Sequence, residues 1–136
     1  MLEATHSPAG TAAAALHYLT DWSGRTRIGL EIWALPRTDL SLRATNCLTT
    51  ALSEALSNVE RHSGAKLVSI AITYTAEHVL RMTVSDDGTG FDRAKVPTGS
   101  GIARMRAAFA ELGGGLSVHS VPGAGTTISA AAKCWG

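Results

Sequence analysis

The spacing of apolar residues changes at Gly64, and this change restricts the fold more than any other feature of the sequence. Before Gly64, apolar residues recur every three or four positions, which predicts one long amphipathic helix from about Asp39 or Ser41 to Arg61. After Gly64 they recur every second position in two runs, which predicts an antiparallel hairpin turning near residues 76–78. The helical set is Leu48, Ala51, Leu52, Ala55, Leu56 and Val59, and the strand sets are Val68, Ile70, Ile72 and Leu80, Met82, Val84.

Shorter segments on either side complete the predicted order of elements. Residues 12–18 favour a helix, and residues 27–35 alternate like a half-buried strand that Pro36 ends. A second amphipathic helix is expected over 102–112, followed by strands near 116–121 and 126–132. This order predicts an α+β fold, a two-layer α/β sandwich with helices on one face of a mixed, largely antiparallel sheet. It lacks the regular alternation of a doubly wound fold, which disfavours a Rossmann interpretation of the glycines.

Composition excludes several classes of function. The chain has 136 residues, a net charge of +1 and 45% apolar residues, which fits one globular domain and gives no electrostatic basis for binding nucleic acid or a membrane. We expect a disordered leader over 1–10 and one domain over 11–136, monomeric when isolated. Cys47 and Cys134 lack metal-ligand spacing, and no signal peptide or membrane helix is apparent, so we expect a reducing, cytoplasmic location.

The stretch VSDDGTGFD, residues 84–92, follows a predicted strand and admits three interpretations: a hairpin turn, a metal loop or a nucleotide site. The spacing lacks the later acids of a calcium-binding loop. Asp86, at the end of the strand, is well placed to accept a hydrogen bond from a ligand at the sheet edge. Gly88 and Gly90 allow unusual backbone angles and close approach of a flat ring. The role of Asp87 stays open.

Two other groups of polar or small residues are candidates for ligand binding. Glu54 and Asn58 share one face of the long helix, where their oxygens could bind Mg²⁺, although a solvated polar flank is the simpler interpretation. Gly99, Ser100 and Gly101 precede the second amphipathic helix, whose amides could bind phosphate. No Lys-Ser or Lys-Thr follows, so this is not a Walker loop, and a flexible entry to the helix remains the alternative.

Four short sequences in a fixed order narrow these alternatives. They are EALSNVERH at 54–62, DDGTGF at 86–91, GSGI at 99–102 and GAGTT at 123–127. Together they resemble the ATP-binding catalytic domain of bacterial sensor histidine kinases, in the GHKL superfamily shared with gyrase and the MutL repair proteins. The wording is most similar to the nitrate-sensor-like subfamily, and the likeness covers about residues 25 to 133.

The resemblance implies a Bergerat-type ATP-binding fold and a role for each matching residue. It implies that Asp86 binds the adenine amine in a pocket that Gly88 and Gly90 keep open, that Asn58 completes Mg²⁺ coordination by ATP, and that Glu54 contacts Mg²⁺ or water. It also implies a lid over about 92–98. The other residues expected at the nucleotide are Arg61, His62, Gly99, Ser100, Gly101, Ile102, Thr126 and Thr127.

The resemblance also implies partners outside this chain. The domain would pass the γ-phosphate of ATP to a histidine on a separate dimerisation domain, and the complete kinase, which can be membrane-anchored, would act on a response regulator. His17 lacks the acidic neighbour expected of a phosphoacceptor, and His6, His78 and His119 are expected to be surface or structural residues. Two alternatives stay open: a stand-alone serine kinase of the anti-sigma-factor type, and a nucleotide-dependent interaction module without transfer activity.

Overall fold

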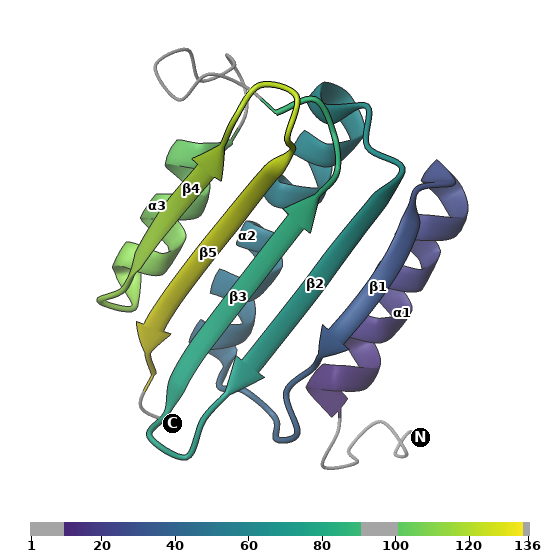
Figure 1. Cartoon of the computed structure of the whole chain (residues 1–136). Helices are drawn as coiled ribbons and strands as arrows, with labels where there is room; N and C mark the ends of the chain where they lie inside the picture. Colours follow the sequence, from purple (N-terminus) through teal and green to yellow (C-terminus); the bar gives the residue numbers. More distant parts are fainter. Residues whose placement is uncertain (1–9, 91–100, 135–136) are drawn as a thin grey trace.

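The computed structural model describes residues 10–90 and 101–134, with residues 62 and 63 described by their backbone alone. In this described part of the chain, three α-helices and five strands follow one another in the predicted order (Figure 1). Their bounds are α1 Gly10–Thr26, β1 Gly29–Ala34, α2 Leu42–Asn58, β2 Leu67–Tyr74, β3 Val79–Asp86, α3 Ile102–Glu111, β4 Gly115–Ser120 and β5 Thr126–Lys133, with a π-helical turn, η2 Val59–Ser63, directly after α2.

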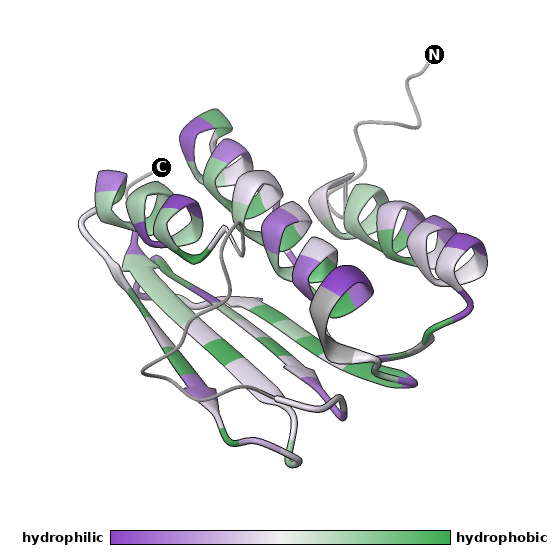
Figure 2. Ribbon diagram, turned by 90° about the horizontal axis from the view of Figure 1, so that it is seen from above, coloured by the Kyte–Doolittle hydropathy of each residue, from purple (hydrophilic) through white to green (hydrophobic). Residues whose placement is uncertain are grey.

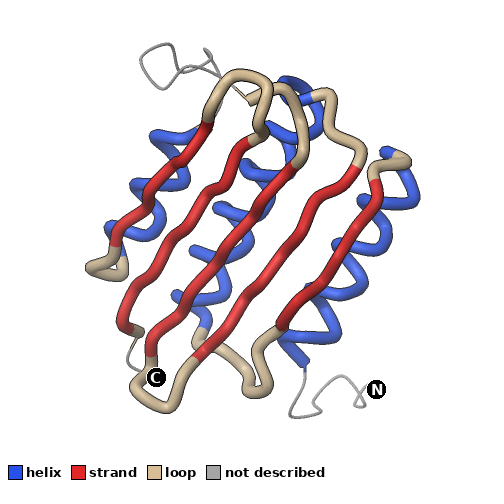
Figure 3. The backbone as a smooth tube through the Cα atoms, viewed as in Figure 1, coloured by secondary structure: helices blue, strands red, loops and turns tan. Residues whose placement is uncertain are grey.

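The five strands form one mixed sheet in the order β1-β2-β3-β5-β4. The β1–β2 pair is parallel and the other pairs are antiparallel, so the predicted hairpin at β2–β3 is confirmed. All three helices lie on the same face of this sheet, as Figures 2 and 3 show from two directions. The α+β sandwich predicted from the order of the elements is therefore the observed architecture.

The core lies between the two layers because both layers present apolar residues at their natural periods. Strand β2 buries Val68, Ile70 and Ile72, and β3 buries alternate residues in the same way. All six apolar positions predicted for the long helix are buried against them. The helix begins where the Ser41 side chain accepts a hydrogen bond from Ala44 N, and it ends at Gly64, whose φ is 63°.

The last turn of the long helix differs from the predicted regular helix. The α-helical pattern ends at Asn58, and residues 59–63 continue as a π-turn, which widens the backbone by one residue per turn. Apolar spacing could not reveal this change, because Val59 is buried in either geometry. The widened turn directly follows Asn58 and includes Arg61 and His62. All three of these residues are expected at the nucleotide.

Helix α1 is longer than predicted and covers Gly10–Thr26 instead of residues 12–18. It packs on the core through Leu19 and Trp22, and Trp22 Nε1 donates a hydrogen bond to Glu60 Oε1 at 2.9 Å. Its polar carboxyl-terminal half concealed its helical character in the sequence. Gly10, which the predicted leader of residues 1–10 includes, is the first residue of this helix, and residues 1–9, including His6, lie outside the described residues.

Candidate nucleotide-binding site

Asp86 is the last residue of β3 and lies beside Thr126, the first residue of β5. It is half-buried, and its Oδ1 accepts a hydrogen bond from Gly88 N at 2.8 Å. Burial raises the pKa of the Asp86 carboxyl above its ordinary value, and hydrogen bonds from the backbone of Gly88 and Thr126 oppose that rise. A carboxylate placed at a strand end and partly removed from water is suited to accept a hydrogen bond from a bound ligand.

Two glycines are required by close packing around Asp86. A β-carbon on Gly125 would collide with the Asp86 carbonyl oxygen, and one on Gly90 would collide with the Val121 carbonyl oxygen. The two glycine-rich segments are also joined directly, since Gly123 N donates to Thr89 O at 2.5 Å. The segments DDGTG and GAGTT are far apart in the sequence. They nevertheless form one unit at this edge of the sheet.

The helix layer contributes Asn58 and Glu54 at the carboxyl-terminal end of α2. The Asn58 Oδ1 atom is buried and has no hydrogen-bond partner among the described residues. One turn earlier, Glu54 Oε2 accepts a hydrogen bond from Arg104 Nη1 at 2.7 Å. A buried amide oxygen without a partner costs free energy unless a ligand satisfies it, so Asn58 marks a position where a cation or a donor would be accommodated.

Gly101 brings the start of α3 against α2. It precedes the first residue of α3 with φ 75°, and an added β-carbon would collide with the Glu54 carboxyl group. In Figure 1 the start of α3, the end of α2, the end of β3 and the β4–β5 turn all lie along the same edge of the molecule. The fold therefore gathers described parts of all four sequence boxes at one edge.

Most of the predicted residues fall at this edge, but not all. Thr126 shares the helix-side face of the sheet with Asp86, and its hydroxyl lies 2.7 Å from Ser120 Oγ. Thr127 faces the opposite side, where its hydroxyl pairs with Ser85 at 2.8 Å, so the structure does not bring its side chain to Asp86. Gly88 and Ile102 are buried. Arg61 is exposed on η2, and only the backbone of His62 is described.

Gly99, Ser100 and Phe91 lie outside the described residues, as does the predicted lid over 92–98. Of the other histidines, His17 is exposed on α1 and His119 is exposed on β4. His78 is part of the β2–β3 turn, where its Nδ1 lies 2.9 Å from the Tyr74 hydroxyl. His78 and His119 therefore lie at structural and surface positions, respectively, as predicted.

Asp87 has a role that the sequence left open. Its Oδ1 accepts hydrogen bonds from Lys66 N at 2.9 Å and Leu67 N at 3.0 Å. The hydrogen bonds from Leu67 and Lys66 lower the pKa of the Asp87 carboxyl. The side chain thus fastens the segment between η2 and β2 to the loop that follows Asp86, which fixes the helix end relative to the sheet end.

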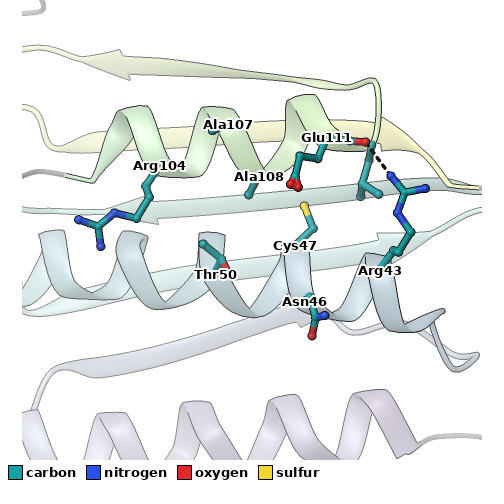
Figure 4. A pocket seen from close by; sticks show the side chains of 9 residues that line it. Arg43, Asn46, Cys47, Thr50, Arg104, Ala107, Ala108 and Glu111 are labelled. Atoms are coloured by element: carbon teal, nitrogen blue, oxygen red, sulfur yellow. Dashed lines mark hydrogen bonds between the residues drawn. The ribbon is translucent and has the colours of Figure 1, made fainter.

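A groove lies between α2 and α3 beside the site (Figure 4). It includes Cys47, and burial raises the pKa of that thiol to about 12, so the sulfur stays protonated at neutral pH. Arg43 closes one end by donating from Nη2 to Glu111 O at 2.9 Å. Arg104 lines the other end, and it is the point at which this groove adjoins Glu54.

Comparison with known proteins identifies the class to which this geometry belongs. Residues 44–134 match the family described as histidine kinase-, DNA gyrase B-, and HSP90-like ATPase. Because the match covers more than half of the chain, the chain belongs to this family and is an ATP-binding domain of the GHKL type. The expected family and the Bergerat-type fold are confirmed, while the nitrate-sensor-like subfamily stays a prediction.

Curated relatives are sensor kinases. The chain is 36% identical to the sensor histidine kinase MctS of Rhizobium johnstonii, over 89% of this chain and 27% of the relative. It is 37% identical to the sensor histidine kinase LiaS of Bacillus subtilis, over 81% of this chain and 30% of the relative. The chain thus spans less than a third of the length of each of these relatives.

Solved structures agree on the fold. A blue-light activated histidine kinase of Erythrobacter litoralis superposes with a TM-score of 0.73 at 20% identity, covering 90% of this chain and 41% of that chain. The histidine kinase domain from the same protein gives a TM-score of 0.67 at 24% identity, covering 89% of this chain and 57% of that chain. At this identity the likeness shows a common fold.

The residues at the edge fit a magnesium nucleotide. Mg²⁺ is usually bound by one or two protein oxygens together with phosphates and water, and Asn58 offers a buried oxygen without a partner. Asp86 offers a half-buried acceptor, and Gly90, Gly101 and Gly125 keep the backbone segments close.

Among the described helices, none is both long and apolar enough to cross a membrane.

Proposed function

We propose that this chain binds Mg-ATP at the edge formed by Asp86, Asn58 and Gly101, and supplies the γ-phosphate to a histidine on a separate dimerisation domain. The observation that carries the proposal is the buried Asn58 oxygen without a partner, one helical turn from a carboxylate and beside the start of α3. A buried oxygen without a partner costs free energy, and Asn58 would offset that cost by acting as a ligand of Mg²⁺ bound together with phosphate.

The base of the nucleotide belongs at the sheet. Asp86 lies on the face that carries the core, next to Thr126, and is already partly desolvated. Its carboxylate can accept a hydrogen bond from an exocyclic amine, which adenine has and guanine lacks at the equivalent ring position. The flat ring would lie beside Asp86 and the buried Gly88, whereas Gly90 packs closely against the carbonyl oxygens of Val121 and Gly125.

The phosphates belong at the helices. Asn58 and the amino-terminal end of α3 both come from the helix layer, and the positive end of a helix dipole favours negative charge. Bound Mg²⁺ would neutralise charge on the transferred phosphoryl group, so the contribution of this chain is positioning and electrostatic stabilisation. Glu54 would contact Mg²⁺ or its water, and Arg61, His62, Gly99 and Ser100 would add phosphate contacts.

The acceptor and the later partners lie on other parts of the kinase. The relatives named as sensor histidine kinases support a histidine-bearing dimerisation domain and a response regulator as partners. Exposed His17 on α1 is not assigned as the acceptor, because its sequence context lacks the expected acid. We further propose that the domain works in the cytoplasm, without contact to nucleic acid or membrane.

Titration calorimetry with Mg-ATP tests the binding half of this proposal. Asp86→Ala removes a hydrogen bond to a charged acceptor, so we expect affinity to fall about 10- to 100-fold. Glu77→Ala, which changes an exposed acid in the β2–β3 turn, is the matched control and should bind like the wild type. Wild-type affinity in Asp86→Ala would refute the assignment of the base.

Transfer is tested separately, with radiolabelled ATP and the dimerisation domain of the same kinase. We expect a phosphorylated product that is stable in alkali and labile in acid, as expected of a phosphohistidine. An acid-stable phosphoserine on a co-purified partner would instead favour the serine-kinase alternative. ATP binding without any labelled protein would favour the interaction module.

A further inference from the structure

The Arg104–Glu54 ion pair is a feature that neither the four sequence boxes nor the proposed function explains. Glu54 lies on α2 and Arg104 in the first turn of α3, and their charged atoms approach to 2.7 Å although the residues are 50 positions apart. Arg104 belongs to none of the four boxes. The pair therefore adds a cation beside the expected phosphate-binding region.

The two partners are held very differently. The Glu54 side chain is 17% exposed and is confined by Gly101, whereas the Arg104 side chain is 74% exposed. The carboxylate is fixed, while the guanidinium can rotate into solvent without disturbing the core. If the pair opens, Arg104 is the partner that moves.

The position of the pair sets what Arg104 can reach. Glu54 is one turn from Asn58 on the same helix face, and Gly101 touches the Glu54 carboxyl group. These are the groups to which we assign Mg²⁺ and the phosphates. An arginine in the first turn of α3 thus lies beside a site that would receive several negative charges at once, and its planar fork matches phosphate oxygens well.

We propose that Arg104 leaves Glu54 when Mg-ATP binds and becomes a binding residue for the triphosphate. The inference rests on the proposed function. Glu54 pairs with the guanidinium that would bind the phosphates, so the carboxylate would compete with the nucleotide for Arg104. Release of Arg104 also frees Glu54 for the contact with Mg²⁺ or water proposed above.

The exchange is energetically small, which suits a reversible switch. An ion pair that is largely exposed on one side stabilises little, equivalent to a factor of about 1.5 to 5 in an equilibrium constant. A charge-assisted hydrogen bond between arginine and phosphate is stronger, equivalent to a factor of about 10 or more. Binding of the triphosphate therefore outweighs loss of the pair with Glu54.

Calorimetry on five variants tests this exchange with Mg-ATP and with adenosine as ligands. We expect Arg104→Met to lower ATP affinity about tenfold and to leave adenosine affinity unchanged. Arg104→Lys keeps the charge and should recover part of the loss. Arg106→Met changes another exposed arginine of α3 and serves as the matched control. Thermal unfolding of each variant establishes that it is folded.

Glu54→Gln, alone and in a double variant with Arg104→Met, separates competition for Arg104 from the contact of Glu54 with Mg²⁺ or water. Loss of the Mg²⁺ or water contact is common to both backgrounds, so if Glu54 competes for Arg104, Glu54→Gln should be about two- to fivefold more favourable to ATP affinity when Arg104 is present. Equal effects of Glu54→Gln in the two backgrounds, or unchanged ATP affinity in Arg104→Met, would overturn the exchange. These outcomes are distinct from failure of the proposed function, in which the wild type itself would not bind Mg-ATP.

Discussion

The edge of the sheet that carries Asp86 is tightly packed, because Gly125 touches the backbone of Asp86. A polar atom at this edge, the Asn58 oxygen, is buried without a hydrogen-bond partner among the described residues. At the opposite edge, around Tyr74 and Cys134, polar groups satisfy one another. The Tyr74 hydroxyl donates to Cys134 O at 3.0 Å, and Cys134 N donates to His78 O at 2.6 Å.

This difference indicates that the polar residues at the Asp86 edge serve binding, whereas those at the Tyr74 edge serve stability. Buried polar groups are normally paired because an unpaired one lowers stability. The site edge departs from that rule and the far edge follows it. Substitutions of polar residues at the site edge should therefore change nucleotide affinity without a matching loss of stability. Substitutions at the far edge should change stability alone.

The largest effect is expected for Gly125→Ala. The new β-carbon would collide with the Asp86 carbonyl, and the left-handed φ of 82° adds strain. We expect a loss of about 2–5 kcal/mol in the free energy of unfolding, from overpacking and backbone strain together. Gly123→Ala is the control, because its φ of 83° is the same but no atom lies within 4 Å. Urea denaturation of both variants measures the difference, and equal losses would contradict the role of close approach.

Asn58→Leu should have the opposite effect on stability. It replaces a buried oxygen without a partner by an apolar group of similar branching, so we expect a gain of about 1 kcal/mol. The same change removes the proposed Mg²⁺ ligand, and Mg-ATP affinity should fall. Urea denaturation and calorimetry on one preparation report both quantities, and a loss of stability would show that the Asn58 amide is satisfied in the folded domain.

Tyr74→Phe tests the far edge. The variant loses the hydrogen bond to Cys134 O and the contact with His78, and we expect a loss of about 1 kcal/mol in stability. Mg-ATP affinity should not change. Tyr18→Phe, at a side chain that is 39% exposed on α1, is the control. A weaker nucleotide affinity in Tyr74→Phe would show that the two edges are coupled.

The smallest effect is expected at Asp87, and it depends on pH. Its folded-state pKa is lowered from 3.8, so the stability it contributes is present above that value and is lost as pH falls through the folded pKa. Asp87→Ala should therefore be less stable than the wild type at pH 7, and the gap should narrow below about pH 3.8. Asp87→Asn keeps an acceptor that does not titrate and should lack this narrowing.

Much of this architecture could be predicted because it follows from local periods. The buried face of α2 and the β2–β3 hairpin are encoded by apolar spacing alone, and Gly64 and Ser41 mark the helix ends. What escaped prediction depends on contacts between distant segments. The pairing of Arg104 with Glu54 becomes visible only when α3 lies against α2.

Thr127 is an instructive case, because strand alternation alone requires Thr126 and Thr127 to face opposite sides of the sheet. Asp86 pairs with Thr126 in register, and successive side chains of a strand point to opposite faces, so Thr127 had to face away. The sequence, however, did not show which of the two threonines was opposite Asp86. Asp87 escaped for a similar reason, since its partners Lys66 and Leu67 lie in a segment that only the fold brings near.

The parallel pairing of β1 with β2 has a consequence for how the sheet forms. β2 and β3 are joined by a short turn, whereas Gly29 meets Leu67 only after the whole of α2 has folded back between them. Closing the longer loop costs more chain entropy, so the β2–β3 hairpin should form before β1 docks against β2, bringing α1 with it. Until then β2 has an open edge at which an unrelated strand could pair.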